Sequence, residues 1–295
     1  CGADHPVPFL KAKDRGWGSF SLVQCAECGL VYTNPRPSIQ AIVRYYPDWY
    51  YSYQETSLST EGRIKNIVSQ VIAEEHYGYE VISNGEAGSW KKIPRWVWRI
   101  PAWWYRHKLS RIPAYRPNGK ILDLGCGNGS YLNHLQGLGW EVYGIEVVEK
   151  AVETARNRFG IDVFCGTLEE AQFPDQWFDA VTMWHVLEHL HSPLESLCEI
   201  HRVLKRNGDL LLTVPNIASP QASLLGDKWI HLDLPRHLYF FAPESMRAIL
   251  KEAGFEVLRV DLVSAPHCLS QSLDYAWSDC CLLYTSPSPR DLSTS

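Results

Sequence analysis

The chain has 295 residues, of which 45% are hydrophobic and 21% charged, and its 28 basic and 33 acidic side chains give a formal net charge of −5. This composition excludes general disorder and a collagen-like chain, and the length allows a large hydrophobic core. No apolar run approaches the roughly 18 residues of a membrane span, and the acidic charge gives no overall attraction to nucleic acid. Nine cysteines without a recognisable secretory leader favour a reducing compartment, so we expect a cytoplasmic protein.

The first predicted segment, residues 1–37, contains a Cys-x-x-Cys-Gly turn formed by Cys25, Cys28 and Gly29. A zinc ribbon needs four soft ligands from two such turns, and Cys1-Gly2 has the form of the second half of another one. We therefore expect a partial zinc-ribbon-like knuckle with Cys1, Cys25 and Cys28 as metal ligands, and structural Zn²⁺ in the full-length protein. A redox role for the pair is the alternative, although it lacks a thioredoxin-like context.

The second segment, residues 38–117, reads as helical and aromatic. Between Trp90 and Lys120 it carries nine Lys and Arg residues, no acidic residue and five of the twelve tryptophans. This pattern fits a helical lid whose tryptophans pack on a catalytic domain, and it also fits peripheral contact of residues 90–120 with a membrane surface. Nucleic acid is the least favoured partner, because the whole chain is acidic.

From residue 118 to about 280, short apolar segments alternate with helical patterns, which predicts an α/β fold with a mostly parallel sheet and helices on both faces. Proline at Pro193 and a capping box over residues 192–195 predict the start of a helix that ends near Gly208. Another helix is expected to stop at Gly160, and one more to run from Pro243 to Gly254. The predicted strands cover residues 121–124, 141–146, 163–165, 179–183, 210–214 and 255–258.

A glycine-rich turn follows the first of these strands, in the sequence Asp-Leu-Gly-Cys-Gly-Asn-Gly from Asp123 to Gly129. Glycine allows a ligand to approach the backbone closely, so a strand, such a turn and a helix form a cradle for a cofactor. A dinucleotide fingerprint would need a further glycine where Ser130 stands. Glu146 stands at the end of the second strand. An acidic residue there can hold the two ribose hydroxyls of a nucleoside-containing cofactor through charge-assisted hydrogen bonds.

These motifs resemble the class I S-adenosylmethionine (SAM) methyltransferases over residues 118–262, which implies a Rossmann-like sheet and SAM as cofactor. The resemblance implies that Asp123 organises the loop and approaches the methionine ammonium group. Cys25-x-x-Cys28-Gly29 followed by Leu-Val-Tyr-Thr-Asn-Pro-Arg-Pro is also similar to small methyltransferases with a zinc-binding N-terminus. The expected cofactor-binding residues are Asp123, Gly125, Cys126, Gly127, Gly129, Glu146, Thr167, Leu168 and Trp184.

Four histidines are candidates for a general base, which a hydroxyl or amine acceptor needs in order to lose its proton. His185 and His189 follow the fourth strand, at the edge of the sheet where α/β proteins bind ligands. His231 and His237 lie in an Arg-His-Leu region that, by resemblance, covers the acceptor site. For each of the four histidines, the alternative is a purely structural role. Glu188 is expected either to stabilise the start of a helix or to take part in the chemistry.

The predicted function is transfer of a methyl group to an oxygen or nitrogen atom of a small-molecule or glycan-type acceptor. An RNA methyltransferase that uses the knuckle and the basic stretch is one alternative, and a non-catalytic SAM-binding module is another. Residues 281–291 match the in-frame translation of a transposase sequencing adapter, so we expect residues 281–295 to be a non-native tail without a role in folding.

Overall fold

The computed structural model describes residues 5–14, 17–46, 112–262 and 272, and these divide into two compact units. One unit is formed by the central part of the chain, residues 46–214 and 249–256. The other combines residues 1–45 with residues 215–248 and 257–295. Each unit is described separately. No helix in the described part of the chain combines the length and the apolar character that membrane crossing requires.

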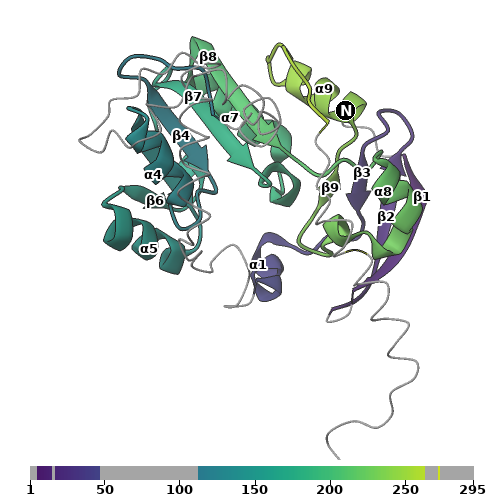
Figure 1. Cartoon of the computed structure of the whole chain (residues 1–295). Helices are drawn as coiled ribbons and strands as arrows, with labels where there is room; N and C mark the ends of the chain where they lie inside the picture. Colours follow the sequence, from purple (N-terminus) through teal and green to yellow (C-terminus); the bar gives the residue numbers. More distant parts are fainter. Residues whose placement is uncertain (1–4, 15–16, 47–111, 263–271, 273–295) are drawn as a thin grey trace, which may run out of the picture. The chain divides into compact units, whose positions relative to one another are not determined.

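The central unit is built on a five-stranded parallel sheet (Figure 1). Its strand order is β6-β5-β4-β7-β8, with β4 in the middle, so the chain first moves outward to one edge and then crosses to the other. This reversal places a topological switch point between β4 and β7, where ligands bind in such sheets. The strands are β4 (Lys120–Leu124), β5 (Glu141–Glu146), β6 (Val163–Cys165), β7 (Phe178–Trp184) and β8 (Leu204–Thr213).

Helices cover both faces of this sheet, as the sequence predicts for crossover connections. The side chains of α4 and α5 share an apolar cluster that includes Leu132, Val152 and Ala155, so these helices lie on the same face. Figure 1 shows α7 on the other side of β7 from α4 and α5. The helices are α4 (Ser130–Gly137), α5 (Glu149–Phe159), α6 (Leu168–Ala171), the 3-10 helix η4 (Leu187–His189) and α7 (Pro193–Val203). Helix α9 (Pro243–Glu252) is divided between the two units, and its residues from Ile249 onward belong to the central one.

Three sequence predictions in this region were wrong. The helix that begins at Pro193 ends at Val203 rather than near Gly208, because Leu204 already pairs with Phe178 as the first residue of β8. Ser192 precedes that helix, but its side chain makes no capping hydrogen bond. Residues 255–258 form no strand, since they pair with no other strand among the described residues.

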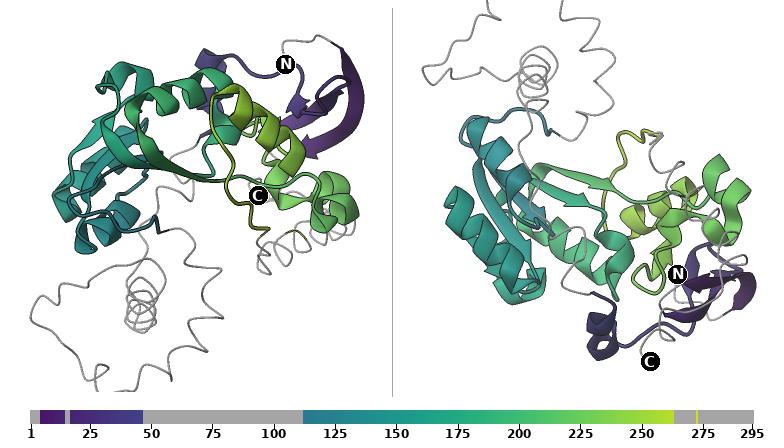
Figure 2. Two further views of the ribbon diagram at one scale, coloured as in Figure 1. Left: turned by 90° about the horizontal axis from the view of Figure 1, so that it is seen from above. Right: turned by 60° about the horizontal axis from the view of Figure 1, so that its bottom comes forward.

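The second unit contains an antiparallel sheet in the order β1-β2-β3-β9, which the sequence analysis did not predict. Strands β1 (Pro6–Asp14), β2 (Gly18–Cys25) and β3 (Val31–Thr33) are consecutive, whereas β9 (Tyr239–Phe240) comes from a distant part of the chain. Figure 2 shows the N-terminal hairpin in purple and the later helix α8 in green. The remaining elements are α1 (Ile39–Ile42), η1 (Val43–Tyr45), α8 (Pro220–Leu225), η5 (Gly226–Lys228) and η6 (Ile230–Leu232).

An apolar cluster joins the two sequence-distant parts of this unit. Leu22 and Val31 from the N-terminal strands are buried together with Trp229, Leu232 and Phe240. The register pairs Val31 with Phe240, so β9 closes the sheet on the side of β3. Residues 215–248 therefore belong to the same compact unit as the N-terminal strands.

Several sequence predictions lie outside the described residues. They include Cys1, most of the aromatic and basic segment, and the predicted tail after residue 280. Two of the nine basic residues of that segment are described. Arg116 forms an ion pair with Asp209 at 2.9 Å, and Lys120 lies 4.1 Å from the ring centre of Trp177, so both make intramolecular contacts.

Candidate active site

A glycine loop joins the end of β4 to the start of α4, at the carboxyl edge of the parallel sheet. The backbone amides of Gly125 and Cys126 donate to the carbonyl oxygen of Ile145 at 2.8 and 3.1 Å, which fixes the loop to β5. Gly125 has a φ of +71°, and a Cβ atom there would lie 2.6 Å from Cγ2 of Val186. Glycine is required here because the segment after β7 packs directly against the loop.

The end of the loop is equally close to its neighbouring helix. Gly129 has a φ of +77°, and a Cβ atom there would lie 2.8 Å from Cβ of Ala155 on α5. The side chain of Cys126 is buried in the apolar cluster beside Leu132, and this burial raises the pKa of its thiol well above the usual value. Cys126 therefore contributes its backbone to the loop, while its neutral thiol fills the core.

Glu146, the last residue of β5, connects the loop to the turn that follows its own strand. Its Oε2 accepts a hydrogen bond from the amide of Gly127 at 2.9 Å, and Oε1 accepts from Val147 and Val148 at 2.8 and 3.1 Å. Burial raises the pKa of the Glu146 carboxyl, whereas these three amides favour the charged form. A carboxylate has about four lone-pair sites, so Glu146 retains the capacity to accept from a ligand hydroxyl.

A second buried carboxyl group lies one strand away. Asp123 on β4 accepts a hydrogen bond from the hydroxyl of Thr182 on β7, with 2.6 Å between the oxygen atoms. Burial, together with the negative charge of Glu146, raises the pKa of Asp123 to about 7, and the hydrogen bond from Thr182 opposes this rise. Two buried carboxyl groups beside a glycine loop form an environment that a cationic ligand would stabilise, and SAM carries an ammonium and a sulfonium group.

Thr167 and Leu168, expected near adenine, begin helix α6. The hydroxyl of Thr167 accepts from the amide of Glu170 at 3.3 Å, and the Glu170 carboxylate accepts from the amide of Thr167 at 2.8 Å. These reciprocal bonds form a capping box, and Leu168 is buried beneath it. The amide of Gly166 donates to the carbonyl of Glu146 at 3.0 Å, which connects this segment to the end of β5.

Trp184, the remaining predicted cofactor contact, is the last residue of β7. Its ring lies edge-on to Tyr131 on α4, with 5.7 Å between the ring centres. The sequence analysis did not single out Thr182 or Val186 as parts of this site. The register could have indicated Thr182, because it pairs with Asp123 on the neighbouring parallel strand and so lies at the same level of the sheet.

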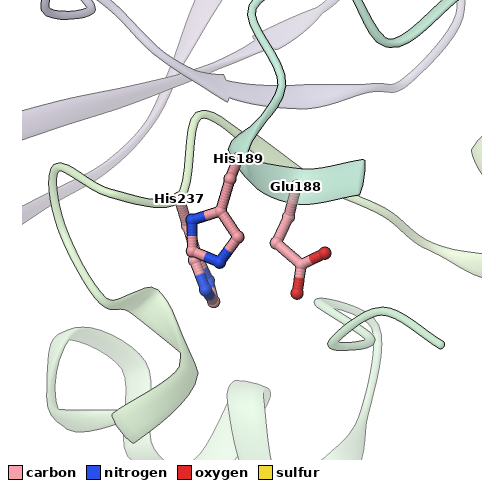
Figure 3. A group of neighbouring side chains, drawn as sticks. All are labelled: Glu188, His189 and His237. Atoms are coloured by element: carbon pink, nitrogen blue, oxygen red, sulfur yellow. The ribbon is translucent and has the colours of Figure 1, made fainter. Parts of the chain in front are cut away.

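Two of the four candidate histidines belong to the central unit. His185 follows β7 directly, and its Nδ1 lies 3.3 Å from Oε1 of Glu188. Nδ1 of His189 forms a hydrogen bond with the hydroxyl of Tyr46 at 2.9 Å. Figure 3 shows that Glu188 and His189 project from the same short helix, η4. Tyr46 lies in the segment predicted as helical and carried no motif that would have pointed to this contact.

The other two histidines belong to the second unit. His237, also drawn in Figure 3, is buried in a loop before β9, and its Nδ1 lies 2.8 Å from the carbonyl oxygen of His231. Its Nε2 lies 3.7 Å from Oδ2 of Asp233, whose carboxylate also binds the guanidinium group of Arg236. The hydroxyl of Thr33 on β3 donates to the carbonyl of His237 at 3.0 Å. This loop is therefore positioned by the N-terminal sheet.

The Cys-x-x-Cys turn follows β2 in the same unit. The amide of Gly29 donates to the carbonyl of Cys25, and the amide of Cys25 donates to the carbonyl of Leu30, both at 2.9 Å. The backbone amide of Cys28, with that of Glu27, lowers the pKa of the Cys25 thiol. The thiolate is the form that binds metal ions, so the chemistry of this turn fits zinc.

Comparison with known proteins identifies the family. Residues 102–260 match the family model described as a methyltransferase domain. The chain is 32% identical over 152 residues to the ubiquinone biosynthesis O-methyltransferase of Pseudomonas aeruginosa, covering 47% of this chain and 65% of that protein. It is 29% identical over 154 residues to the mitochondrial enzyme of the same name from Arabidopsis thaliana, covering 48% of each chain.

Among solved structures, an S-adenosylmethionine-dependent methyltransferase from Mesorhizobium loti matches with a TM-score of 0.45 at 18% identity, covering 59% of this chain and 91% of that chain. The chain spans about half to two thirds of the length of the two ubiquinone biosynthesis enzymes. The family model covers more than half of the chain and begins before the glycine loop and ends after α9. The chain therefore belongs to the methyltransferase domain family.

Proposed function

We propose that the protein transfers a methyl group from SAM to an oxygen or nitrogen atom of a small-molecule or glycan-type acceptor. The observation that carries the proposal is the pair of buried carboxyl groups, Asp123 and Glu146, on either side of the glycine loop. SAM supplies an already electrophilic methyl group, so the main task of the protein is to align an acceptor with it. The curated relatives named above are O-methyltransferases, which favours oxygen as the accepting atom.

Each group in the loop has a defined part in this proposal. Glu146 would hold the ribose hydroxyls, because its carboxylate lies at the strand end and is oriented by three amides. Asp123 would face the methionine ammonium group and orient the loop. The segment of Thr167 and Leu168 would contact adenine. Histidines near the carboxyl edge would take the proton that the acceptor loses.

The first experiment identifies the acceptor. Purified protein is incubated with methyl-labelled SAM and a metabolite extract, with and without nuclease treatment, and labelled products are identified by mass spectrometry. We expect nuclease-resistant label on a small molecule or glycan. Label that nuclease releases would instead support an RNA methyltransferase, and SAM binding without any transfer would support a non-catalytic module.

We also infer a structural zinc ion at Cys25 and Cys28, with Cys1 as a third ligand. The tight turn at these residues and the lowered pKa of Cys25 support this inference. Metal analysis of the purified protein would report bound zinc, and Cys28→Ser would remove it. Equal zinc content in the wild type and this variant would contradict the assignment.

A further inference from the structure

His185 occupies a distinctive place beside the cofactor loop. Its amide donates to the carbonyl of Thr213 at 2.9 Å, so it continues the ladder between β7 and β8 by one residue. The next residue, Val186, touches the position that a Cβ atom on Gly125 would occupy. His185 is therefore held at the carboxyl edge of the sheet, one residue away from direct packing on the glycine loop.

The backbone of His185 is constrained in an unusual conformation. Its φ is +56°, in the left-handed region that only a few per cent of non-glycine residues adopt, among which Asn, Asp and His are the most frequent. The surrounding contacts must impose this conformation, since it is unfavourable by itself. Such residues occur preferentially at functional sites, where a side chain has to be aimed away from the direction of its strand.

A buried carboxylate accompanies this histidine. Glu188 is 0% exposed, and its Oε1 lies 3.3 Å from Nδ1 of His185. The side chain of His185 is 38% exposed, so the pair combines one fully buried partner with one that solvent or a substrate can reach. A proton on Nδ1 would face this carboxyl group, and the basic lone pair would then lie on Nε2.

We propose that His185 is the general base for methyl transfer and that Glu188 is its positioning residue. This inference rests on the proposed function and deepens it by selecting one histidine among four. The O–H or N–H bond of the acceptor breaks, and its proton goes to Nε2 of His185. The acceptor atom forms a bond to the methyl carbon with its own electron pair, while the carbon–sulfur bond of SAM breaks and leaves its pair on sulfur.

The negative charge of Glu188 has two effects on this step. It orients the ring before the acceptor binds, and it stabilises the imidazolium ion that forms when the proton arrives. Other titratable groups lie at the carboxyl ends of β4 and β5 and on η4. They are Asp123, Glu146 and His189, respectively. They are unchanged when Glu188 is replaced, so a comparison of variants isolates its contribution.

Glu188→Gln provides the test, since it keeps the size of the side chain and removes its charge. Ring ¹⁵N resonances of the histidines in wild type and variant are compared by NMR, with His185→Asn used to assign His185. We expect the wild type to favour the tautomer of His185 with the proton on Nδ1, and the variant to lose this preference, because the negative partner of Nδ1 is gone. The same tautomer distribution in both proteins would overturn the role of Glu188.

Kinetics with the acceptor identified above supply the second readout. In Glu188→Gln, kcat should fall at least tenfold at unchanged KM for SAM. His185→Asn should lower kcat at least a hundredfold, whereas His191→Asn, a nearby histidine outside the pair, should leave it unchanged. Full activity of His185→Asn would overturn the inference.

Binding of SAM by calorimetry separates this inference from the proposed function. Retained SAM affinity with full activity in His185→Asn would refute the base and leave the methyltransferase assignment intact. If Glu188→Gln fails to fold, Glu188→Asp replaces it, since it keeps the charge and shortens the side chain by one methylene. The preference of His185 for the tautomer with the proton on Nδ1 should weaken there as well, and an unchanged preference would count against the pair.

Discussion

At the scale of single residues, Asp123 illustrates how a binding group reduces the stability of its own fold. An unfolded aspartate ionises near pH 3.8, whereas burial keeps the Asp123 carboxyl protonated up to about pH 7 in the folded protein. The folded state therefore binds more protons than the unfolded state between these two values. This contribution makes the free energy of unfolding decrease as pH rises through that range and stay lowered above it.

Asp123→Asn removes the charge while keeping the shape of the side chain. Without bound SAM, we expect the variant to gain stability relative to the wild type as pH rises from 5 to 8, by at most a few kcal/mol at about 1.4 kcal/mol per pKa unit. Thermal unfolding at several pH values measures the difference, and calorimetry should show weaker SAM binding. A Tm difference between variant and wild type that is independent of pH would contradict the raised pKa of Asp123.

We also expect Asp123 to make SAM binding sensitive to pH in the wild type. If the carboxylate form faces the ammonium group, affinity should weaken as pH falls below about 7, where the carboxyl becomes protonated. In Asp123→Asn this dependence should disappear between pH 6 and 8, while the affinity itself is lower throughout. Titration calorimetry over this range checks the prediction, and a pH-dependent affinity that persists in the variant would assign the effect to another group.

Glu146 offers a matched comparison within the same loop. Glu146→Gln keeps one acceptor oxygen but loses the charge, and Glu146→Ala removes both. We expect Glu146→Ala to abolish measurable SAM binding and Glu146→Gln to weaken it at least tenfold, because hydrogen bonds to a charged group are about twice as strong as neutral ones. Unchanged affinity in Glu146→Ala would refute the assignment of this residue to the cofactor.

At the scale of elements, the loop between β4 and α4 depends on glycine for two separate reasons. Gly125 needs a positive φ, and its missing side chain leaves room for Val186. Gly125→Ala should therefore lower both SAM affinity and the free energy of unfolding. Gly137→Ala on α4 is the matched control, since a Cβ atom there meets no other atom within 4 Å, and it should be neutral or slightly stabilising. Equal effects of both substitutions on Tm would contradict the packing argument.

The elements also show what sequence patterns can predict. The strand at residues 141–146 and the end of the following helix at Gly160 were predicted correctly, because apolar periodicity and a C-terminal glycine are local signals. The end of α7 was placed wrongly, since Leu204 enters β8 through a pairing with Phe178 that no local signal encodes. The contact of Thr182 with Asp123 likewise depends on the pairing of two strands that are distant in the sequence.

At the scale of the whole molecule, one folding unit is assembled from both ends of the described chain. Leu22 and Val31 supply part of an apolar cluster whose other members include Trp229 and Phe240. Because strand β9 pairs with β3 in the sheet, the loop that carries His231 and His237 is ordered by residues about two hundred positions earlier. The N-terminal strands thus serve as a scaffold for that loop, whether or not zinc is bound nearby.

This arrangement predicts a long-range effect of a core substitution. Leu22→Ala opens a cavity in the cluster and should destabilise the unit by about 2–5 kcal/mol. Hydrogen exchange followed by mass spectrometry should then show faster exchange in residues 229–241, while strands β4 and β5 of the central unit keep their protection. Val7→Ala, at a position 44% exposed on β1, is the control and should change exchange in neither region. Unchanged exchange at 229–241 in Leu22→Ala would mean that this segment is ordered without the N-terminal strands.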